Sequence, residues 1–210
     1  MDLMDMTVKG FVDELASSSP APGGGTIAAV SGAFAAGLGE MICTLTLQKN
    51  SLQEIQDGLL PLKSEFEALK KRLLELADED TQSFNKVMAA FRLPKGSAAE
   101  VLARKSAIAQ ANLGATLVPL ETAMVSVDAA RGLSRAVSLI NANVMSDCGV
   151  AMECAKTAAL GAIMNVAINL PGIKDEQRKA EIEKELLVLK QNTENIYNLS
   201  AEKLNERFSY

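Results

Sequence analysis

The chain has 210 residues, of which 21 are Lys or Arg and 26 are Asp or Glu, so its formal net charge is −5. This length allows one large domain with a sizeable core, and we predict a single domain over residues 1–210. The acidic balance and the lack of any Lys/Arg-rich run exclude the positive field typical of nucleic-acid binders. We therefore expect no DNA or RNA partner.

Histidine is absent, which narrows the chemistry available to the chain. Ser/His/Asp and Cys/His nucleophile systems and most zinc sites are excluded, which leaves Asp and Glu as the natural acid–base groups. The three cysteines, Cys43, Cys148 and Cys154, lie in apolar segments without CxxC spacing, and an odd number argues against a disulfide framework. We expect a cytoplasmic protein, since the N-terminus also lacks the pattern of a secretory signal.

Apolar residues recur with a period of 3.6 almost throughout, which predicts an all-α fold: a multihelical bundle with long antiparallel helices. The first predicted helix is capped by Thr7, carries an inner apolar stripe from Val8 to Leu15, and ends at the loop SSSPAPGGG. This loop precedes the most apolar segment of the chain.

A central helix rich in small residues is predicted from about residue 26 to residue 47. Small residues recur every three or four positions and allow another backbone to approach closely: Ser31, Gly32, Ala35, Ala36 and Gly39. A membrane span is the alternative interpretation. Glu40 lies inside the helix and a Pro/Gly loop precedes it, so we favour a helix packed inside a bundle and expect no membrane partner.

The next predicted helix, from about residue 59 to residue 91, carries a carboxylate on its core stripe. Its apolar positions are Leu62, Phe66, Leu69, Leu73 and Leu76. The same step continues to Asp80, and a buried Asp must be paired, hold a raised pKa or face a cavity. Alternatively, the stripe shifts to Ala77, Phe84 and Met88, and Asp80 emerges into solvent.

Three further helices complete the prediction. Ser97 and Glu100 match a capping box, so a helix begins near residue 98; we expect it to kink around Pro119 and to loosen at residues 131–132. The segment NANVMSDCGV opens an apolar helix that ends near Asn169, and polar groups on its inner face require partners or a ligand. A charged helix over about 175–207 should lie across the outside.

The glycines at positions 23 to 25 form a candidate anion site. Gly23, Gly24 and Gly25 can adopt backbone conformations closed to other residues and present bare N–H groups at a helix start, where the dipole favours negative charge. The pattern is neither a Walker loop nor a Rossmann fingerprint. A plain tight turn that allows close helix packing explains the same residues.

Six motifs occur together in order: PAPGGG, D-x-x-x-F at 80–84, LPK at 93–95, an Arg at 104, N-x-N-x-x-S-D at 141–147 and NVAIN at 165–169. In this combination the chain resembles the cyclodeaminase/cyclohydrolase family, which includes the C-terminal domain of formiminotransferase-cyclodeaminase and stand-alone methenyltetrahydrofolate cyclohydrolases. The resemblance extends from about residue 3 to the start of the last helix. Thr26 and Ile140 stand where the family often has Ser and Gly, which puts the loop conformation at Ile140 in question.

The resemblance implies a folate one-carbon enzyme: a cyclodeaminase that converts 5-formiminotetrahydrofolate to 5,10-methenyltetrahydrofolate and ammonia or, as the alternative, a methenyltetrahydrofolate cyclohydrolase. Both reactions pass through a tetrahedral carbon and need no metal or redox cofactor. A carboxylic acid with a raised pKa can move the protons that they require.

Asp80 is the main candidate for this acid–base group, because the helix pattern and the family motif both select it. Asp78 also matches the family pattern and is the reserve candidate. We expect Asp147 to be a second carboxylate that orients the pterin or holds a water, with Ser146 and Asn141 as helpers.

The carboxylates of the folate tail require cationic or N–H partners. Lys95, Arg104 or the turn of Gly23 to Gly25 are the candidates, and an ordinary exposed charge is the alternative for Lys95 and Arg104. We further expect a homodimer, since oligomers are commonly two-fold, and a formiminotransferase as a separate partner. A non-enzymatic helical assembly and a simple anion-binding protein remain open from the residues alone.

Overall fold

The computed structural model describes residues 3–206, and within that range it contains helices and no strand. This confirms the predicted all-α fold. The helices are η1 (Leu3–Asp5), α1 (Val8–Leu15), α2 (Gly24–Lys49), α3 (Gln53–Phe91), α4 (Ala98–Ala136), η2 (Ala142–Val144), α5 (Met145–Asn169), η3 (Leu170–Gly172) and α6 (Glu176–Asn205).

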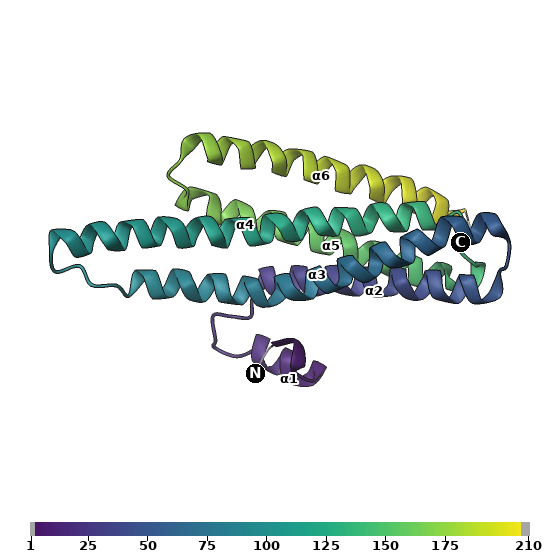
Figure 1. Ribbon diagram of the computed structural model, residues 1–210, viewed down its shortest axis with the longest axis horizontal. Coiled ribbons are helices and arrows are strands. Elements are labelled where there is room, and N and C mark those ends of the chain that lie inside the picture. The colour runs from purple at the N-terminus through teal and green to yellow at the C-terminus, as the bar shows by residue number, and fades with distance from the viewer. Residues whose placement is uncertain (1–2, 207–210) are drawn as a thin grey trace.

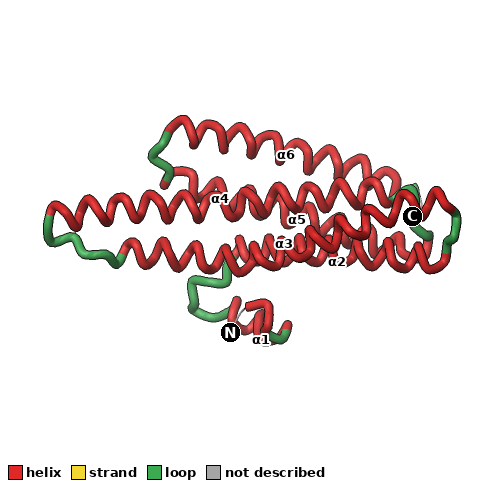
Figure 2. The backbone as a smooth tube through the Cα atoms, in the orientation of Figure 1, coloured by secondary structure: helices red, strands yellow, loops and turns green. Residues whose placement is uncertain are grey.

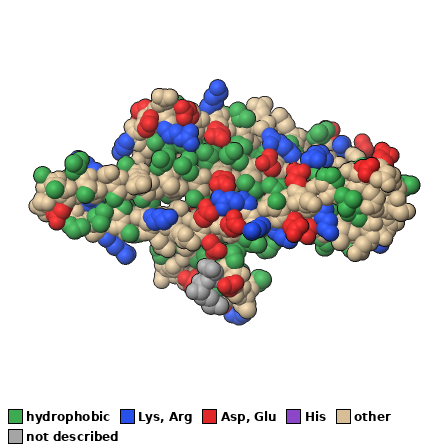
Figure 3. Space-filling model, in the orientation of Figure 1, with side chains coloured by type: hydrophobic (Ala, Val, Ile, Leu, Met, Phe, Trp, Pro, Cys, Tyr) green, Lys and Arg blue, Asp and Glu red, His purple; other side chains and the backbone are tan. Residues whose placement is uncertain are grey.

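The four helices α2, α3, α4 and α5 pack lengthwise, and α6 runs obliquely along the outside of α4 and α5 (Figure 1). The hairpin of α3 and α4 extends beyond the N-terminal end of α2, at the left of the tube view (Figure 2). Hydrophobic side chains are exposed at this projecting end in the space-filling view (Figure 3). The predicted bundle of long antiparallel helices is therefore present, and the α3–α4 hairpin extends beyond it.

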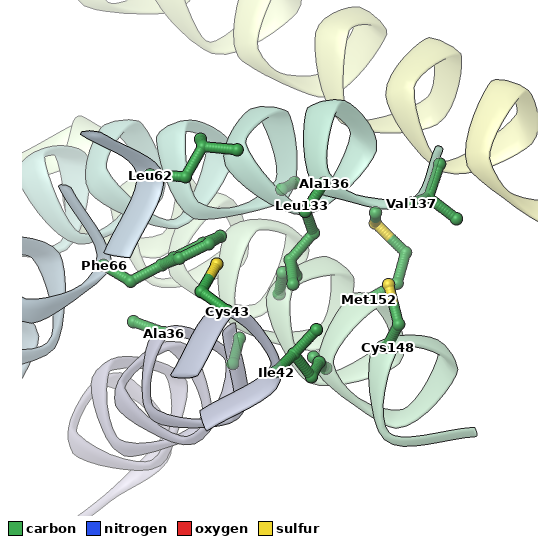
Figure 4. Packing of buried hydrophobic residues seen from close by; sticks show 14 of the residues in the cluster. Ala36, Ile42, Cys43, Leu62, Phe66, Leu133, Ala136, Val137, Cys148 and Met152 are labelled. Atoms are coloured by element: carbon green, nitrogen blue, oxygen red, sulfur yellow. The ribbon is translucent and has the colours of Figure 1, made fainter. Parts of the chain in front are cut away.

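The small residues of α2 allow large side chains of α3 to enter the centre of the bundle. Phe66 is fully buried beside Cys43 and Leu133 (Figure 4). A Cβ atom on Gly39 of α2 would lie 2.7 Å from the Phe66 ring, and one on Gly132 of α4 would lie 2.9 Å from it. The ring fits between the two helices because both positions lack a side chain, as predicted for α2.

Two helix caps predicted from the sequence are present. The Thr7 hydroxyl accepts from the backbone N–H of Gly10 at the start of α1. The predicted capping box is present at the start of α4, with Ser97 and Glu100 each accepting from the other's backbone N–H.

Other boundaries differ from the prediction. Helix α2 begins at Gly24, and α3 begins at Gln53 and continues through Pro61. Helix α4 is unbroken over its whole length and runs without a visible bend in Figure 1, so neither the loosening at 131–132 nor a kink around Pro119 interrupts it. Of the range predicted for the last helix, Arg207 lies outside the described residues.

The predicted inner stripe of α1 is wrong, because this helix stands off the bundle (Figure 1). Val8 is 79% exposed and Val12 is 52% exposed. None of the residues of α1 is buried.

Three helical segments are long and apolar enough to cross a membrane by length and composition: Gly24–Lys49, Ala98–Ala136 and Ala142–Gly172. Between 39% and 56% of the apolar window in each is buried inside the bundle. Helix α2 packs against α3, α4 and α5, and its Glu40 forms an ion pair with Lys70. Packing against other helices accounts for much of this apolar character, and the absence of a membrane partner stays a prediction.

Candidate functional site

A cavity of about 290 Å³ opens at the N-terminal end of α2. The loop before α2 and the helices α2 to α5 all contribute to its wall. The lining residues are Pro20, Ala21, Gly23, Gly24, Gly25, Asp80, Phe84, Val87, Asn112, Ala115, Asn165, Ile168 and Asn169. The glycine turn and Asp80, which the sequence selected separately, therefore meet in one place.

Asp80 is held against the first turn of α2. Its Oδ2 atom accepts a hydrogen bond of 2.9 Å from the hydroxyl of Thr26, and the backbone of Thr26 adds a second hydrogen bond. Thr26 itself is fully buried, and its hydroxyl also lies 3.3 Å from that of Thr81. The carboxyl group is thus fixed at the end of a helix that carries free N–H groups.

The glycine at position 25 is required by the carboxylate. A Cβ atom there would lie 2.2 Å from Oδ1 of Asp80 and 2.7 Å from its Cγ, distances that no side chain tolerates. At Gly24 the nearest atom would be Nδ2 of Asn165 at 3.5 Å, an ordinary contact. None of the described glycines has a positive φ, so the expectation that this turn needs unusual backbone angles is wrong. The turn is glycine-rich where Asp80 approaches the backbone.

The pKa of Asp80 is raised above its ordinary value, because burial disfavours the charged form. The hydrogen bonds from Thr26 act in the opposite direction, and burial is the larger effect. The neutral acid is therefore more populated than in a free Asp. This confirms the expectation of a desolvated carboxyl on the core stripe and contradicts the alternative that Asp80 emerges into solvent.

Three carboxamides form the polar wall opposite the glycine turn. Asn112 extends from α4, and Asn165 and Asn169 extend from α5, one helical turn apart. Asn165 donates from Nδ2 to the carbonyl oxygen of Gly161 at 2.9 Å, and Asn169 donates to that of Ala115 at 2.8 Å. The cavity thus combines a protonatable carboxyl group, helix N–H groups and amide side chains. These groups suit a polar heterocycle that carries either an anionic group or a nitrogen leaving group.

Comparison with known proteins identifies the family of the chain. The family model described as formiminotransferase-cyclodeaminase matches residues 7–187. The chain belongs to the formiminotransferase-cyclodeaminase family.

Relatives of this family differ in length and in the activity by which they are named. Methenyltetrahydrofolate cyclohydrolase of Methylorubrum extorquens is 36% identical, with 95% of this chain and 98% of that protein covered. Formimidoyltransferase-cyclodeaminase of Mus musculus is 31% identical over 83% of this chain and 32% of its own length. The crystal structure of formiminotetrahydrofolate cyclodeaminase from Thermotoga maritima superimposes with a TM-score of 0.86, at 27% identity and with 97% and 98% of the two chains covered. These relatives identify the chain as an enzyme of folate metabolism. It spans about a third of the length of the bifunctional relatives.

The cations predicted for the folate tail lie outside the Asp80 cavity. Lys95 is exposed in the loop between α3 and α4, and Arg104 donates to the carbonyl oxygen of Phe91 at 3.1 Å while its guanidinium stacks over the Phe91 ring. Two other lysines, Lys105 and Lys174, lie beside the site. They line a neighbouring cavity of about 480 Å³ that shares Asn112 with the Asp80 cavity.

The remaining predicted residues do not join Asp80 within one chain. Asp78, two residues before Asp80 on α3, is not among the lining residues. Asn141, Ser146 and Asp147 lie at the opposite end of α2, where the backbone N–H of Asn141 donates to the hydroxyl of Thr46. Thr46 follows Thr26 by twenty residues of helix, which is about 30 Å. Asp147 therefore does not line the Asp80 cavity within one chain, and its role in orienting the pterin or holding a water stays a prediction.

Sequence reasoning missed two participants. Thr26 was noted only as a departure from the family pattern, although it is the hydrogen-bond donor to Asp80. Asn112 lies in a part of α4 that matches none of the motifs, and no local signal marks it. Within residues 3–206, no group of three His, Cys, Asp or Glu side chains could hold a metal ion, and a reaction without a cofactor stays a prediction.

Proposed function

We propose that this chain is a formiminotetrahydrofolate cyclodeaminase, which converts 5-formiminotetrahydrofolate to 5,10-methenyltetrahydrofolate and ammonia. The observation that carries the proposal is the Asp80 carboxyl group, which has a raised pKa and is held by Thr26 in a cavity at the start of α2. The names of the Thermotoga maritima and Mus musculus relatives support the same substrate class.

The proposed reaction requires proton transfer at a leaving nitrogen. N10 of the substrate attacks the formimino carbon, and the resulting tetrahedral adduct loses the N10 proton while its amino group gains one. Ammonia then departs and leaves the methenyl bridge. In this proposal neutral Asp80 donates a proton to the departing nitrogen, and its carboxylate takes up the N10 proton. No metal or redox cofactor is required for these steps.

The second candidate is methenyltetrahydrofolate cyclohydrolase, in which water adds to the methenyl carbon and the adduct opens to 10-formyltetrahydrofolate. It is favoured by the match to the Methylorubrum extorquens enzyme, which is covered almost completely. Asp80 would serve as the general base for water and then as the acid for the opening ring.

Methenyl-folate absorbance separates the two candidates. The purified chain is given 5-formiminotetrahydrofolate in one assay and 5,10-methenyltetrahydrofolate in another. A cyclodeaminase produces the methenyl absorbance and releases ammonia, whereas a cyclohydrolase removes the absorbance faster than buffer alone. Wild-type protein that does neither overturns the proposal.

The proposed enzyme acts as a homodimer through one apolar face of α2 and α5, which we name the α2/α5 face. Its exposed side chains are Phe34 and Met41 on α2 and Val150, Met164 and Ile168 on α5. Phe34 and Val150 line one almost wholly apolar hollow of about 580 Å³, so the two helices contribute to a continuous surface. Exposed apolar patches of this kind are typical of protein interfaces.

A two-fold axis through the middle of the α2/α5 face would have a consequence for the site. If that axis is perpendicular to the helices of the face, the helices of the two copies are antiparallel, and the α4–α5 connection of one copy lies at the Asp80 end of the other. Asp147, Ser146 and Asn141 could then complete the partner's cavity, although they lie far from Asp80 in their own chain.

The glutamyl tail of the folate is proposed to leave the Asp80 cavity past Asn112 and to reach Lys105 and Lys174. Neither lysine forms an ion pair with any residue in the part of the chain that the structure describes.

We also propose a cytoplasmic location. A separate formiminotransferase is proposed as the supplier of the substrate, because the bifunctional relatives carry both names.

A further inference from the structure

Helix α4 passes through Pro119, which has no N–H group. In an unbroken helix this group would donate to the carbonyl oxygen four residues earlier, which belongs to Ala115. Here Nδ2 of Asn169, from α5, donates to that oxygen at 2.8 Å. A side chain of one helix thus replaces the hydrogen bond that Pro119 removes from another.

The same arrangement determines which end of the Asn169 side chain remains free. The amide group of Asn169 donates one hydrogen to the carbonyl oxygen of Ala115, and that of Asn165 donates one to the carbonyl oxygen of Gly161. Within residues 3–206 neither carboxamide oxygen has a hydrogen-bond partner, and neither is sealed from solvent. Both residues line the Asp80 cavity. Two acceptor oxygens are therefore available on one face of α5.

We propose that Asn165 and Asn169 accept hydrogen bonds from N–H donors on the ring of the substrate, and that Pro119 is the positioning residue that holds Asn169 for this task. The inference rests on the proposed function, because the pterin ring of a folate carries adjacent donors, an amino group and a ring N–H. Asp80 lies in the same cavity, so a ring held by the two carboxamides would bring its one-carbon bridge to the carboxyl group.

A purely structural role for Asn169 makes a different prediction. If its side chain serves only to satisfy the Ala115 carbonyl, restoring the missing N–H should make it dispensable. Pro119→Ala restores that N–H, and α4 can then form its own hydrogen bond to Ala115. Asn169 must then share this oxygen with a backbone N–H and is held less firmly, while the helix gains a better residue for its interior.

The experiment compares Pro119→Ala with Pro61→Ala in methenyl-folate assays and thermal melts. Pro61 is the matched control, since it also lies inside a helix but is exposed on α3 and does not line the cavity. We expect Pro119→Ala to raise KM about tenfold, with kcat changed less than about twofold and no loss of thermal stability. Pro61→Ala should leave both constants unchanged.

Asn169→Ala provides an independent reading if Pro119→Ala folds poorly. It should raise KM to a similar extent, and the double variant should be no worse than Asn169→Ala alone, because both changes act through one side chain. Wild-type KM in either a folded Pro119→Ala or an Asn169→Ala variant would overturn the inference and leave the function standing. Wild-type protein that is inactive on both folates would overturn both.

Discussion

The two ends of α2 carry the same family's motifs but are built differently. At its N-terminal end, Asp80 and three carboxamides surround a cavity, and a glycine brings the backbone against the carboxyl group. At its C-terminal end, Thr46 and the backbone of Asn141 satisfy each other, and apolar residues such as Val144 and Met145 close the bundle. The first end thus places Asp80 in a cavity of the single chain, whereas Ser146 at the second end lines a separate cavity of about 460 Å³ without Asp80.

The largest expected effect is at the open end. Asp80→Asn keeps the size and shape of the side chain while removing its titrating proton, so we expect turnover to fall by roughly a hundredfold to ten-thousandfold. The fold should persist, because the amide can still accept from Thr26. Turnover is measured by methenyl-folate absorbance, with Asp78→Asn as the matched control. Near wild-type turnover in the Asp80 variant would remove Asp80 from the mechanism.

The same variant tests the raised pKa of Asp80 through stability. A carboxyl group whose folded pKa is raised binds its proton more tightly in the folded state, so wild-type stability falls as pH rises from the unfolded pKa, about 4, through the folded pKa. Asp80→Asn should therefore be more stable than wild type at neutral pH, and this advantage should vanish below about pH 4. Thermal melts across pH measure it. An advantage that grows towards low pH would contradict the assigned direction.

Gly25→Ala should affect catalysis strongly without removing any functional group. The added Cβ would force the Asp80 carboxyl group away from Thr26, and a displacement of about 1 Å can cost roughly a hundredfold in rate. Gly24→Ala is the control, since its Cβ would meet Asn165 at an ordinary distance. Assays and melts of both variants should show a large difference in turnover. Equal behaviour would mean that the close approach of Asp80 is not needed.

The next prediction tests whether Asp147, near the C-terminal end of α2, contributes to the site of a partner subunit. Asp147→Asn should lower turnover roughly tenfold or more, by removing a charge-assisted contact. If sites are shared across a two-fold axis, mixing Asp147→Asn with Asp80→Asn subunits gives mixed dimers with one intact site each, and about a quarter of wild-type activity should return. No recovery after subunit exchange would exclude a site shared by Asp80 of one copy and Asp147 of the other.

Phe34→Glu tests the surface that this sharing requires. If the chain forms the proposed dimer, a charge in the α2/α5 face should convert it to monomers in light scattering and lower turnover to the level of Asp147→Asn. Val8→Glu, on the exposed side of α1, is the control and should change neither quantity. A Phe34 variant that stays dimeric would exclude this face as the interface.

The smallest expected effect concerns the folate tail. Replacing Lys105 and Lys174 by Ala should raise KM a few-fold without changing kcat, because exposed ion pairs contribute little individually and are screened by salt. The rise should shrink as ionic strength increases. Lys95→Ala, in the exposed loop between α3 and α4, should leave KM unchanged. A larger effect at Lys95 would restore the prediction made from sequence.

The sequence alone determined the all-α fold, most helix boundaries, the cap at Thr7, the capping box at Ser97, and Asp80 as a carboxyl group on the core stripe. These properties are local: helical periodicity and capping depend on residues within a few positions of one another. The raised pKa of Asp80 followed as well, since burial could be inferred from the stripe.

Only the tertiary structure decided which of these groups meet. Gly25 is small because a carboxyl group from a different helix lies against it, and Asn169 is fixed by a carbonyl that Pro119 left without a donor on α4. Asp147 and Asp80 match motifs of one family, yet the length of α2 separates them within the chain. Such contacts join residues that are tens of positions apart in the chain, so they depend on how the helices pack. The order of the motifs along the chain does not show how far apart they lie in space.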